Sequence, residues 1–271
     1  MLMQITLGIL LGVAVSLSAW RLGSLSRNGT LAAAVTGGLI FGLGGLPWAG
    51  LLLTFFISSS LLSKAFKTRK GAVIEKFAKG SQRDWGQVLA NGGLGTMLVV
   101  AFAIFPDQPW IWFAYAGAMA AVNADTWATE LGVLNPSQPR LITSGRSVEP
   151  GTSGAISLVG TFATLCGALL IGLVGAIFSP ADARLPLVLA ASLGGLCGSL
   201  FDSLLGATLQ AIYYCPKCDK ETERHPTHTC GTGTHQMRGW GWLNNDLVNF
   251  LASIVGAGIA LVVYVFLSSG S

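Results

Sequence analysis

Four carboxylates stand in segments that are otherwise strongly apolar: Asp125, Glu130, Asp202 and Asp246. An ionisable side chain inside a membrane segment is costly and is a functional candidate by default. Mg²⁺ is usually held by one or two carboxylates together with substrate phosphates. We therefore expect a site for Mg²⁺ and a nucleotide, in which Asp125 and Glu130 hold the metal. Asp202 would be a further ligand or would orient the attacking phosphate.

Helix geometry gathers the polar neighbours of Asp125 and Glu130 on one side of their segment. At about 100° per residue, Asn123, Thr126 and Thr129 fall with the two acids within an arc of about 160°. Polar residues that only form hydrogen bonds to neighbouring helices would also fall within such an arc. Two acids in so short a run favour a polar cavity with a function.

A loop rich in arginine, hydroxyl groups and glycine follows at 139–154. Arginine makes bidentate contacts with phosphate, and the N–H groups of a helix start favour anions. An ordinary loop with a capping Thr-Ser pair is the alternative. We expect Arg140 and Arg146 to neutralise phosphate charge, and a helix start at Gly151–Gly154 to cradle it. The other binding candidates here are Glu149, Thr152, Ser153 and Ser157.

Polar residues of three other segments can join this site. Asp202 shares a helix face with Gly206 and Gln210, because the three are spaced four apart. Asp246 opens the last apolar segment and could instead be an N-terminal helix cap, so the sequence leaves both roles open. The remaining binding candidates are Asn91, Ser203, Asn245 and Asn249.

Three cysteines and a histidine form a compact pattern between the last two apolar segments. The pattern is Cys215-x2-Cys218-x9-His228-x-Cys230, and tetrahedral zinc takes Cys and His ligands of this kind. A cytoplasmic, reducing location argues against a disulfide, and unliganded cysteines are the alternative. Four protein ligands leave no open position, so we expect structural Zn²⁺.

The elements that position these residues are expected to be membrane helices. Of the 271 residues, 52% are hydrophobic and 10% are charged, against about 25% charged in a soluble domain. These values exclude a soluble domain with a charged surface and a disordered chain. A spanning helix needs about 20 mostly apolar residues. The expected spans are Leu2–Trp20, Leu31–Leu46, Pro47–Ser63, Trp85–Phe105, Pro109–Leu134, Gly154–Phe178, Leu185–Tyr213 and Leu243–Leu267.

The basic residues orient these eight spans. Leu31–Leu46 and Pro47–Ser63 are together too long for one straight span, with glycines and a proline where they meet. We therefore expect two short helices joined by a tight turn. With eight spans, only Arg184 of the 16 basic residues falls on the opposite side from the others. The positive-inside rule makes the basic side cytoplasmic and places both termini on the other side.

Two segments allow other interpretations. Leu2–Trp20 could be a cleaved signal peptide, but no basic residue precedes it. The basic run 64–83 is expected to set topology or to contact anionic lipid head groups. No nucleic-acid partner is expected.

Five stretches of this sequence resemble one integral membrane family. They are NADTWATELG (123–132), RSVEPGTSGAIS (146–157), GSLFDSLLGATLQ (198–210), the loop Cys215–Cys230 and WLNNDLVN (242–249). That family includes transmembrane protein 19 and the plant phytyl-phosphate kinase of tocopherol synthesis. The likeness covers the chain from roughly Gly8 to Gly256.

The resemblance implies transfer of a phosphoryl group from a nucleoside triphosphate, with CTP preferred, to an isoprenyl monophosphate such as phytyl phosphate. A weaker likeness extends to CTP-dependent polyprenol kinases and CDP-lipid synthases, which often have lysine where Arg140 and Arg146 stand. We therefore expect a kinase that uses Mg²⁺, CTP and a lipid isoprenyl phosphate. The alternatives are a CDP-lipid-type cytidylyltransferase and a transporter or flippase of a phosphorylated isoprenoid.

The expected fold is an all-α, polytopic transmembrane bundle that forms a single integral membrane domain over 1–271. A small cytoplasmic Cys/His-rich zinc loop is expected at 214–241. The expected location is a plasma or thylakoid membrane, with the active site facing the cytoplasm or the stroma.

Overall fold

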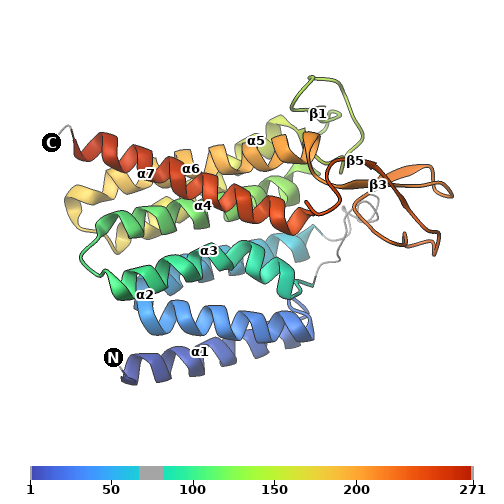
Figure 1. The fold of residues 1–271 in the computed structure, drawn as a ribbon. Coiled ribbons are helices and arrows are strands. Elements are labelled where there is room, and N and C mark those ends of the chain that lie inside the picture. Colours follow the sequence, from blue (N-terminus) through green and yellow to red (C-terminus); the bar gives the residue numbers. More distant parts are fainter. Residues whose placement is uncertain (1, 67–81, 270–271) are drawn as a thin grey trace.

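A computed structural model describes residues 2–66 and 82–269. This part of the chain contains seven helices and five short strands. The helices are α1 (Leu2–Arg21), α2 (Arg27–Ala65), α3 (Trp85–Ile104), α4 (Pro109–Gly132), α5 (Leu158–Ile177), α6 (Ala181–Thr208) and α7 (Asn245–Ser268). The strands are β1 (Arg140–Leu141), β2 (Ala155–Ile156), β3 (Ile212–Cys215), β4 (Lys220–Thr222) and β5 (His235–Arg238). The predicted all-α bundle is confirmed (Figure 1).

The long helix α2 is broken where the two predicted short helices meet. Gly45 has φ of 71° and ψ of −159°, a backbone conformation that glycine adopts without steric cost. Pro47 follows at once, in the first turn of the next helix, where its missing N–H group is not needed. The halves 27–44 and 46–65 then run back along each other (Figure 1). The predicted pair of short helices is thereby confirmed.

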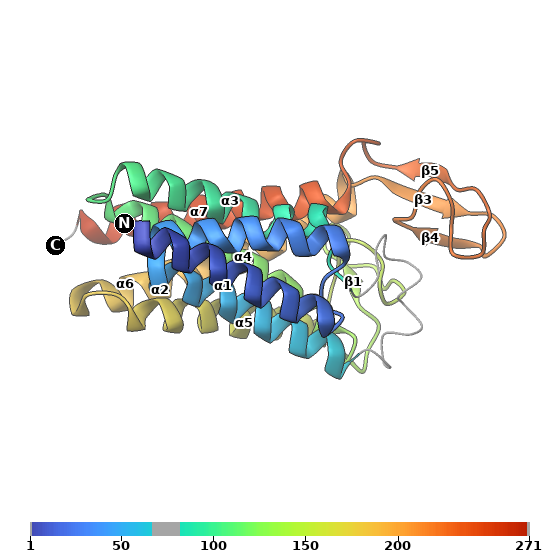
Figure 2. The ribbon, with the colours of Figure 1, turned by 90° about the horizontal axis from the view of Figure 1, so that it is seen from below.

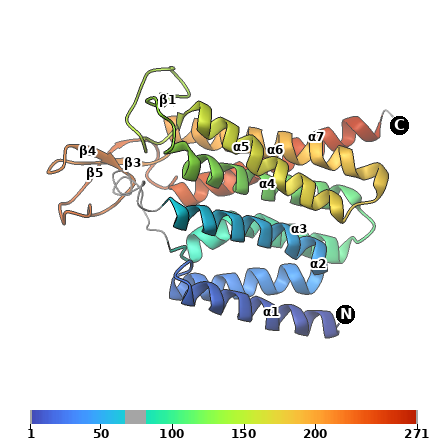
Figure 3. The same ribbon diagram turned by 180° about the vertical axis from the view of Figure 1, so that it is seen from behind.

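The helix α4 lies at the centre of the bundle. Most of its residues between Ile111 and Ala124 are buried, and it contacts α2, α3, α5, α6 and α7 (Figure 3). The other six helices, with α2 counted once, are each long and apolar enough to span a membrane. The central helix is therefore shielded by the helices around it.

Small residues bring α4, α6 and α7 close together. A Cβ atom added at Gly198 of α6 would lie 2.5 Å from Cβ of Ala121 and 2.9 Å from the carbonyl oxygen of Ala252. Gly256 of α7 packs against Ala121 in the same way. Between membrane helices, small residues allow this close approach of the backbones. The packing fixes the acidic residues of α4 and α6 relative to one another.

Replacing Gly198 by valine is expected to lower the stability of the bundle. The added side chain has no room between α4 and α7, and overpacking of this kind costs about 1–3 kcal/mol. The measurement is the Tm of the detergent-purified protein. Gly258→Val is the matched control, because a Cβ at Gly258 of α7 meets no atom within 4 Å. Equal Tm values for the two variants would refute the close packing.

The two ends of the bundle differ in character. Both termini lie at one end, together with the turn before α6 that leads to Arg184. The strands lie at the other end (Figures 1 and 2). The basic loops that the structure describes therefore share the end opposite the termini. Most of the basic run 64–83 falls at 67–81, outside the described residues.

The last two helices differ from their predicted limits. α6 begins four residues before Leu185 and ends at Thr208, short of Tyr213. The chain enters β3 instead, which pairs with β4 and β5 in an antiparallel three-stranded sheet. The start of α7 is moved to Asn245. The Cys/His-rich loop is thus a small β structure and not a continuation of the helices.

Candidate functional site

A cavity of about 620 Å³ lies where α3, α4, α5, α6 and α7 meet the loops that follow α4 and α6. Most of the polar residues chosen from the sequence line it. They are Asn91, Asp125, Thr126, Thr129, Glu130, Gly151, Thr152, Ser153, Gly154, Ser157, Asp202, Ser203, Gln210, Asn245, Asp246 and Asn249. Residues from five separate parts of the chain therefore form one polar site.

Asp125 of α4 and Asp202 of α6 bring two carboxylates into one cavity. The Ser199 hydroxyl donates to Oδ1 of Asp125 at 3.5 Å. Oδ2 of Asp202 is buried and has no hydrogen-bond partner among the described residues. A buried carboxylate oxygen of this kind calls for a donor or a cation. The residues at this point therefore fit a hard divalent cation such as Mg²⁺.

Arg83, which the sequence predicts only as part of the basic run that sets topology or contacts anionic lipid head groups, lines the same cavity. Its Nη1 donates to Oγ of Ser60 at 3.0 Å, and its Nη2 donates to Oγ of Ser59 at 2.9 Å. Burial lowers the pKa of Arg83, and the nearby Glu130 carboxylate raises it. An arginine remains charged at physiological pH. Within the described chain, Arg83 is the only lysine or arginine in the cavity lining.

Glu130 lines the cavity near Arg83, five residues after Asp125 on α4. Its Oε1 accepts a 2.6 Å hydrogen bond from the hydroxyl of Ser63 in α2. The side chain is buried, so this part of α2 fixes where the carboxylate points. Glu130 and Asp125 thus face one cavity, as their helical arc predicts.

Glu223 was also missed, and it reaches the cavity from the Cys/His-rich loop. Its Oε1 accepts hydrogen bonds from Oγ of Ser153 at 2.9 Å and from Nε2 of Gln210 at 2.8 Å. Arg238 of β5 anchors the loop, because its Nη1 donates to the carbonyl oxygen of Gly206 at 2.7 Å. Burial lowers the pKa of Arg238, and nearby glutamates raise it. The loop therefore contributes a further carboxylate to the site.

The segment Gly151–Gly154 forms a turn and not the predicted helix start. Its two end glycines have φ of 80° and 82°, in the region that favours glycine. The residues of β2 then pair with β1, so α5 begins only at Leu158, with Ser157 as its cap. The predicted local structure is wrong, yet the turn lines the cavity.

Three predicted site residues lie outside the cavity lining, in β1 and in the loop between β1 and β2. Arg140, Arg146 and Glu149 are exposed there. Nη1 of Arg140 donates to the carbonyl oxygen of Gly145 at 2.9 Å. The structure therefore does not bring these arginines to the carboxylates, and their contact with phosphate stays a prediction.

Asn123 also lies outside the cavity, buried in α4. Its Nδ2 donates to the carbonyl oxygen of Gly167 in α5 at 2.7 Å. Its Oδ1 accepts from the hydroxyl of Ser58 in α2 at 3.0 Å. Asn123 thus links α4 to α5 and α2 by hydrogen bonds, two residues before Asp125.

Asp246 is not the cap of α7. Oδ1 of Asn244 accepts from the backbone N–H of Leu247 at 3.0 Å and makes the cap. Asp246 lies in the first turn and lines the cavity with Asn245 and Asn249. The capping alternative is therefore wrong, and Asp246 belongs to the cavity lining.

The Cys/His cluster is assembled as its spacing predicts. The ligand atoms of Cys215, Cys218, His228 and Cys230 all lie within 4.8 Å of one another. The sulfur atoms of Cys215 and Cys230 are 3.5 Å apart, and Nδ1 of His228 is 3.4 Å from the sulfur of Cys230. Zinc–sulfur bonds of about 2.3 Å in a tetrahedron place ligands at such separations. The four residues therefore fit a tetrahedral zinc site.

The thiols of this cluster differ in acidity. Hydrogen bonds from Thr232 and His228 lower the pKa of Cys230 to about 5. The hydrogen bond to Cys230 and burial raise the pKa of Cys218 to about 11. The cluster therefore contains a thiolate at neutral pH, which is the form that binds metal.

Comparison with known proteins places the whole chain in one family. The protein-family model described as "Integral membrane protein DUF92" matches residues 10–257. Protein PGR of Arabidopsis thaliana is 31% identical over 287 residues, which cover 97% of this chain and 98% of that protein. An uncharacterized membrane protein of Methanocaldococcus jannaschii is 33% identical over 263 residues, covering 97% and 95%.

A third relative is more distant. "Protein VTE6, chloroplastic" of Arabidopsis thaliana is 27% identical over 254 residues, which cover 90% of this chain and 66% of that protein. No solved structure matches the chain. From its span of matched residues and its polytopic helical fold, the chain belongs to the integral membrane protein family DUF92.

Proposed function

We propose that this protein transfers a phosphoryl group from a nucleoside triphosphate, with CTP preferred, to an isoprenyl monophosphate such as phytyl phosphate. The observation that carries the proposal is the single cavity lined by Asp125, Glu130, Asp202, Glu223 and Asp246. The resemblance of the surrounding motifs to the phytyl-phosphate kinase family supports the class of substrate.

The charge of the cavity favours a metal-assisted reaction. Five carboxylates line it against one arginine among the described residues, so it would repel phosphate groups unless cations accompany them. Asp125, Glu130 and Asp202 would hold Mg²⁺, which in phosphoryl transfer offsets negative charge and polarises the γ-phosphate. The need for accompanying cations is specific to an anionic substrate. It is not expected of polar residues that only hold neighbouring helices together.

The reaction needs mainly positioning by the protein. An oxygen of the isoprenyl phosphate forms a bond to the γ-phosphorus, the bond from that phosphorus to the bridging oxygen breaks, and CDP leaves. The acceptor is already an anion, so no strong general base is required. Arg83 would neutralise phosphate charge, and the turn Gly151–Gly154 with Ser157 would line the phosphates with backbone and hydroxyl groups.

The Cys/His-rich loop would have a structural role with Zn²⁺. It holds Glu223 against Ser153 and Gln210, and so closes one side of the cavity. The excess of basic residues at this end supports a location on the cytoplasmic or stromal side of a plasma or thylakoid membrane. Nucleotide would enter from water at that side, and the lipid phosphate would enter from the bilayer.

The test is a transfer assay with the purified protein, Mg²⁺, [γ-³²P]CTP and phytyl or geranylgeranyl monophosphate. Label recovered in the lipid, as isoprenyl diphosphate, is the expected result. Label recovered only in pyrophosphate would identify a cytidylyltransferase and overturn the kinase proposal. No turnover, with movement of the lipid phosphate across vesicles, would overturn both enzymes in favour of a transporter.

A further inference from the structure

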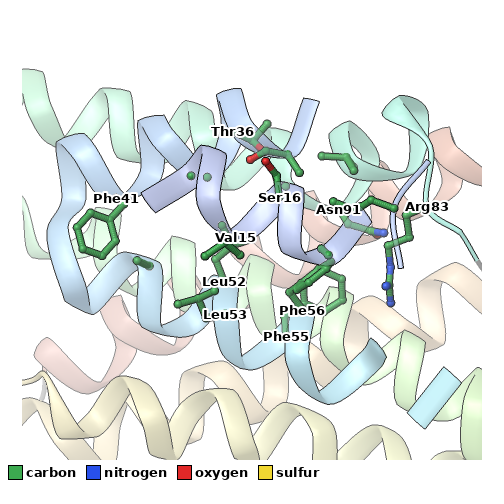
Figure 4. A pocket seen from close by; sticks show the side chains of 18 of the residues that line it. Val15, Ser16, Thr36, Phe41, Leu52, Leu53, Phe55, Phe56, Arg83 and Asn91 are labelled. Atoms are coloured by element: carbon green, nitrogen blue, oxygen red, sulfur yellow. The ribbon is translucent and has the colours of Figure 1, made fainter. Parts of the chain in front are cut away.

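A second cavity of about 160 Å³ lies beside the polar site and is almost entirely apolar. It forms a groove between α1, both halves of α2 and α3. Leu11, Val15, Phe41, Leu52 and Phe56 are among its lining residues. Figure 4 shows Phe41 at one end of the groove, and Arg83 and Asn91 at the other. The groove therefore runs along the helices from an apolar end to a charged end.

The groove and the polar cavity share one edge. Arg83, Gln87 and Asn91 line both of them. The last two are four residues apart on α3, so they lie on the same face of that helix. Of the described residues that line the groove, Arg83 is the only charged one. A ligand that fills both spaces must combine an apolar chain with an anionic group, and the two must meet at this edge.

The position of Arg83 is fixed before any ligand binds. Its N–H donates to the carbonyl oxygen of Ser24 at 3.0 Å, and its carbonyl oxygen accepts from the N–H of Ser26 at 3.0 Å. Its guanidinium lies 5.9 Å and 5.6 Å from the ring centres of Phe55 and Phe56. The two serine hydroxyls that it contacts use one N–H on each terminal nitrogen, and a guanidinium has five. The hydrogen bonds that Arg83 makes with the described residues therefore leave N–H donors for an oxyanion.

We propose that this groove holds the isoprenoid chain of the lipid phosphate and that Arg83 binds the phosphate at its mouth. The identity of the lipid rests on the proposed function, whereas the place of chain and head group rests on the groove and Arg83. The phosphate then lies at the edge of the cavity that contains Asp125 and Glu130. The chain is directed away from these carboxylates, along α1 and α2.

The groove also limits the length of the chain. Gly29 of α2 packs against the carbonyl oxygen of Arg83, and Phe41 lies twelve residues further along the same helix. At about 1.5 Å per residue, the groove extends about 18 Å from Arg83 to Phe41. This length suits an extended chain of several isoprene units.

Two glycines give a direct test of this placement. Gly37 and Gly92 line the groove from α2 and α3, and a Cβ added at either meets no atom within 4 Å. Leucine at Gly37, four residues before Phe41, would fill the groove towards its apolar end, and leucine at Gly92 would fill it beside Asn91, in both cases without displacing the backbone. Gly258→Leu is the matched control, since Gly258 also faces open space but lines neither cavity.

The experiment measures equilibrium binding to the full-length protein in detergent, without nucleotide. The probes are geranylgeranyl monophosphate, the shorter geranyl monophosphate, and dioleoyl phosphatidic acid. We expect Gly37→Leu and Gly92→Leu to weaken binding of the long isoprenyl phosphate at least about 10-fold, since a filled groove excludes several methylene-sized groups. Binding of the short phosphate should change little in Gly37→Leu, and Gly258→Leu should match the wild type.

Three results would overturn the placement of the chain. They are equal binding of the long and short phosphates by the wild type, unchanged long-chain binding by both leucine variants, and phosphatidic acid binding as tightly as the isoprenyl phosphate. Because no nucleotide is present, these outcomes are independent of phosphoryl transfer. If the leucine variants bind the long isoprenyl phosphate as the wild type does, this inference alone is refuted. A failed transfer assay would refute the proposed reaction alone.

The head-group assignment has its own test. Arg83→Gln should reduce binding of geranylgeranyl monophosphate about 10- to 100-fold, the worth of a charge-assisted hydrogen bond, and should leave binding of uncharged geranylgeraniol near the wild-type value. Arg83→Lys should recover part of the loss, because it restores the charge without the planar fork. Equal losses for the phosphate and the alcohol in both variants would show a structural role and overturn the assignment.

Discussion

Asp125→Asn is expected to lower turnover by about 100- to 1,000-fold while the protein stays folded. Removal of one well-placed electrostatic group from an active site has an effect of this size, and under the proposed function the lost charge is one that would hold Mg²⁺. The amide has nearly the same shape as the carboxylate and can still accept the hydrogen bond from Ser199. The measurements are the initial rate of lipid labelling from [γ-³²P]CTP and the Tm.

Asp107→Asn is the matched control for this substitution. Asp107 is exposed in the turn between α3 and α4 and lines neither cavity. Its turnover should equal that of the wild type. Wild-type turnover in Asp125→Asn would refute the role of this carboxylate in holding Mg²⁺.

Cys218→Ser is expected to remove bound zinc and to reduce turnover by about 10- to 100-fold, the range seen when residues that support a metal site are lost. The physical reason is indirect. Without its metal, the loop would no longer hold Glu223 and Arg238 against α6 and the turn at Ser153. Metal content measured by mass spectrometry checks the loss of zinc, and the rate of lipid labelling checks the loss of turnover.

The control for the zinc prediction is Cys166→Ser, because Cys166 lies in α5, away from the cluster. It should keep its zinc and its activity. Acidification should release the metal, since thiolate and imidazole ligands must be deprotonated to bind it. A Cys218→Ser protein that retains one zinc per chain, or that loses zinc and keeps full turnover, would disprove the structural role.

The membrane fold could be predicted because its signals are local. Runs of apolar residues mark the helices, and Gly45 before Pro47 marks the break in α2. The limits of α5 and α6 could not be predicted in the same way. The strand pair β1–β2 takes residues that could equally begin a helix, and β3 takes the apolar residues from Ile212 onward. Strand pairing depends on partners distant in sequence, which the local pattern does not show.

The candidate site was predictable where polar residues stand out against apolar neighbours. Asp125, Glu130 and Asp202 are conspicuous for this reason, and the structure places all three in one cavity. Arg83 and Glu223 lie in polar segments, where a charged residue has no contrast with its surroundings. The only local sign near Arg83 is the capping box that Asp84 and Gln87 form at the start of α3, which fixes where the helix begins.

The measurement that most directly tests the central claim is the product ratio of a single reaction, determined by mass spectrometry. Wild-type protein is incubated with CTP, Mg²⁺ and geranylgeranyl monophosphate, and both the nucleotide and lipid products are quantified. We expect one CDP for each geranylgeranyl diphosphate, and formation of both products about 100- to 1,000-fold slower with Asp125→Asn. Release of pyrophosphate in place of CDP, or CDP without the lipid diphosphate, would contradict the central claim.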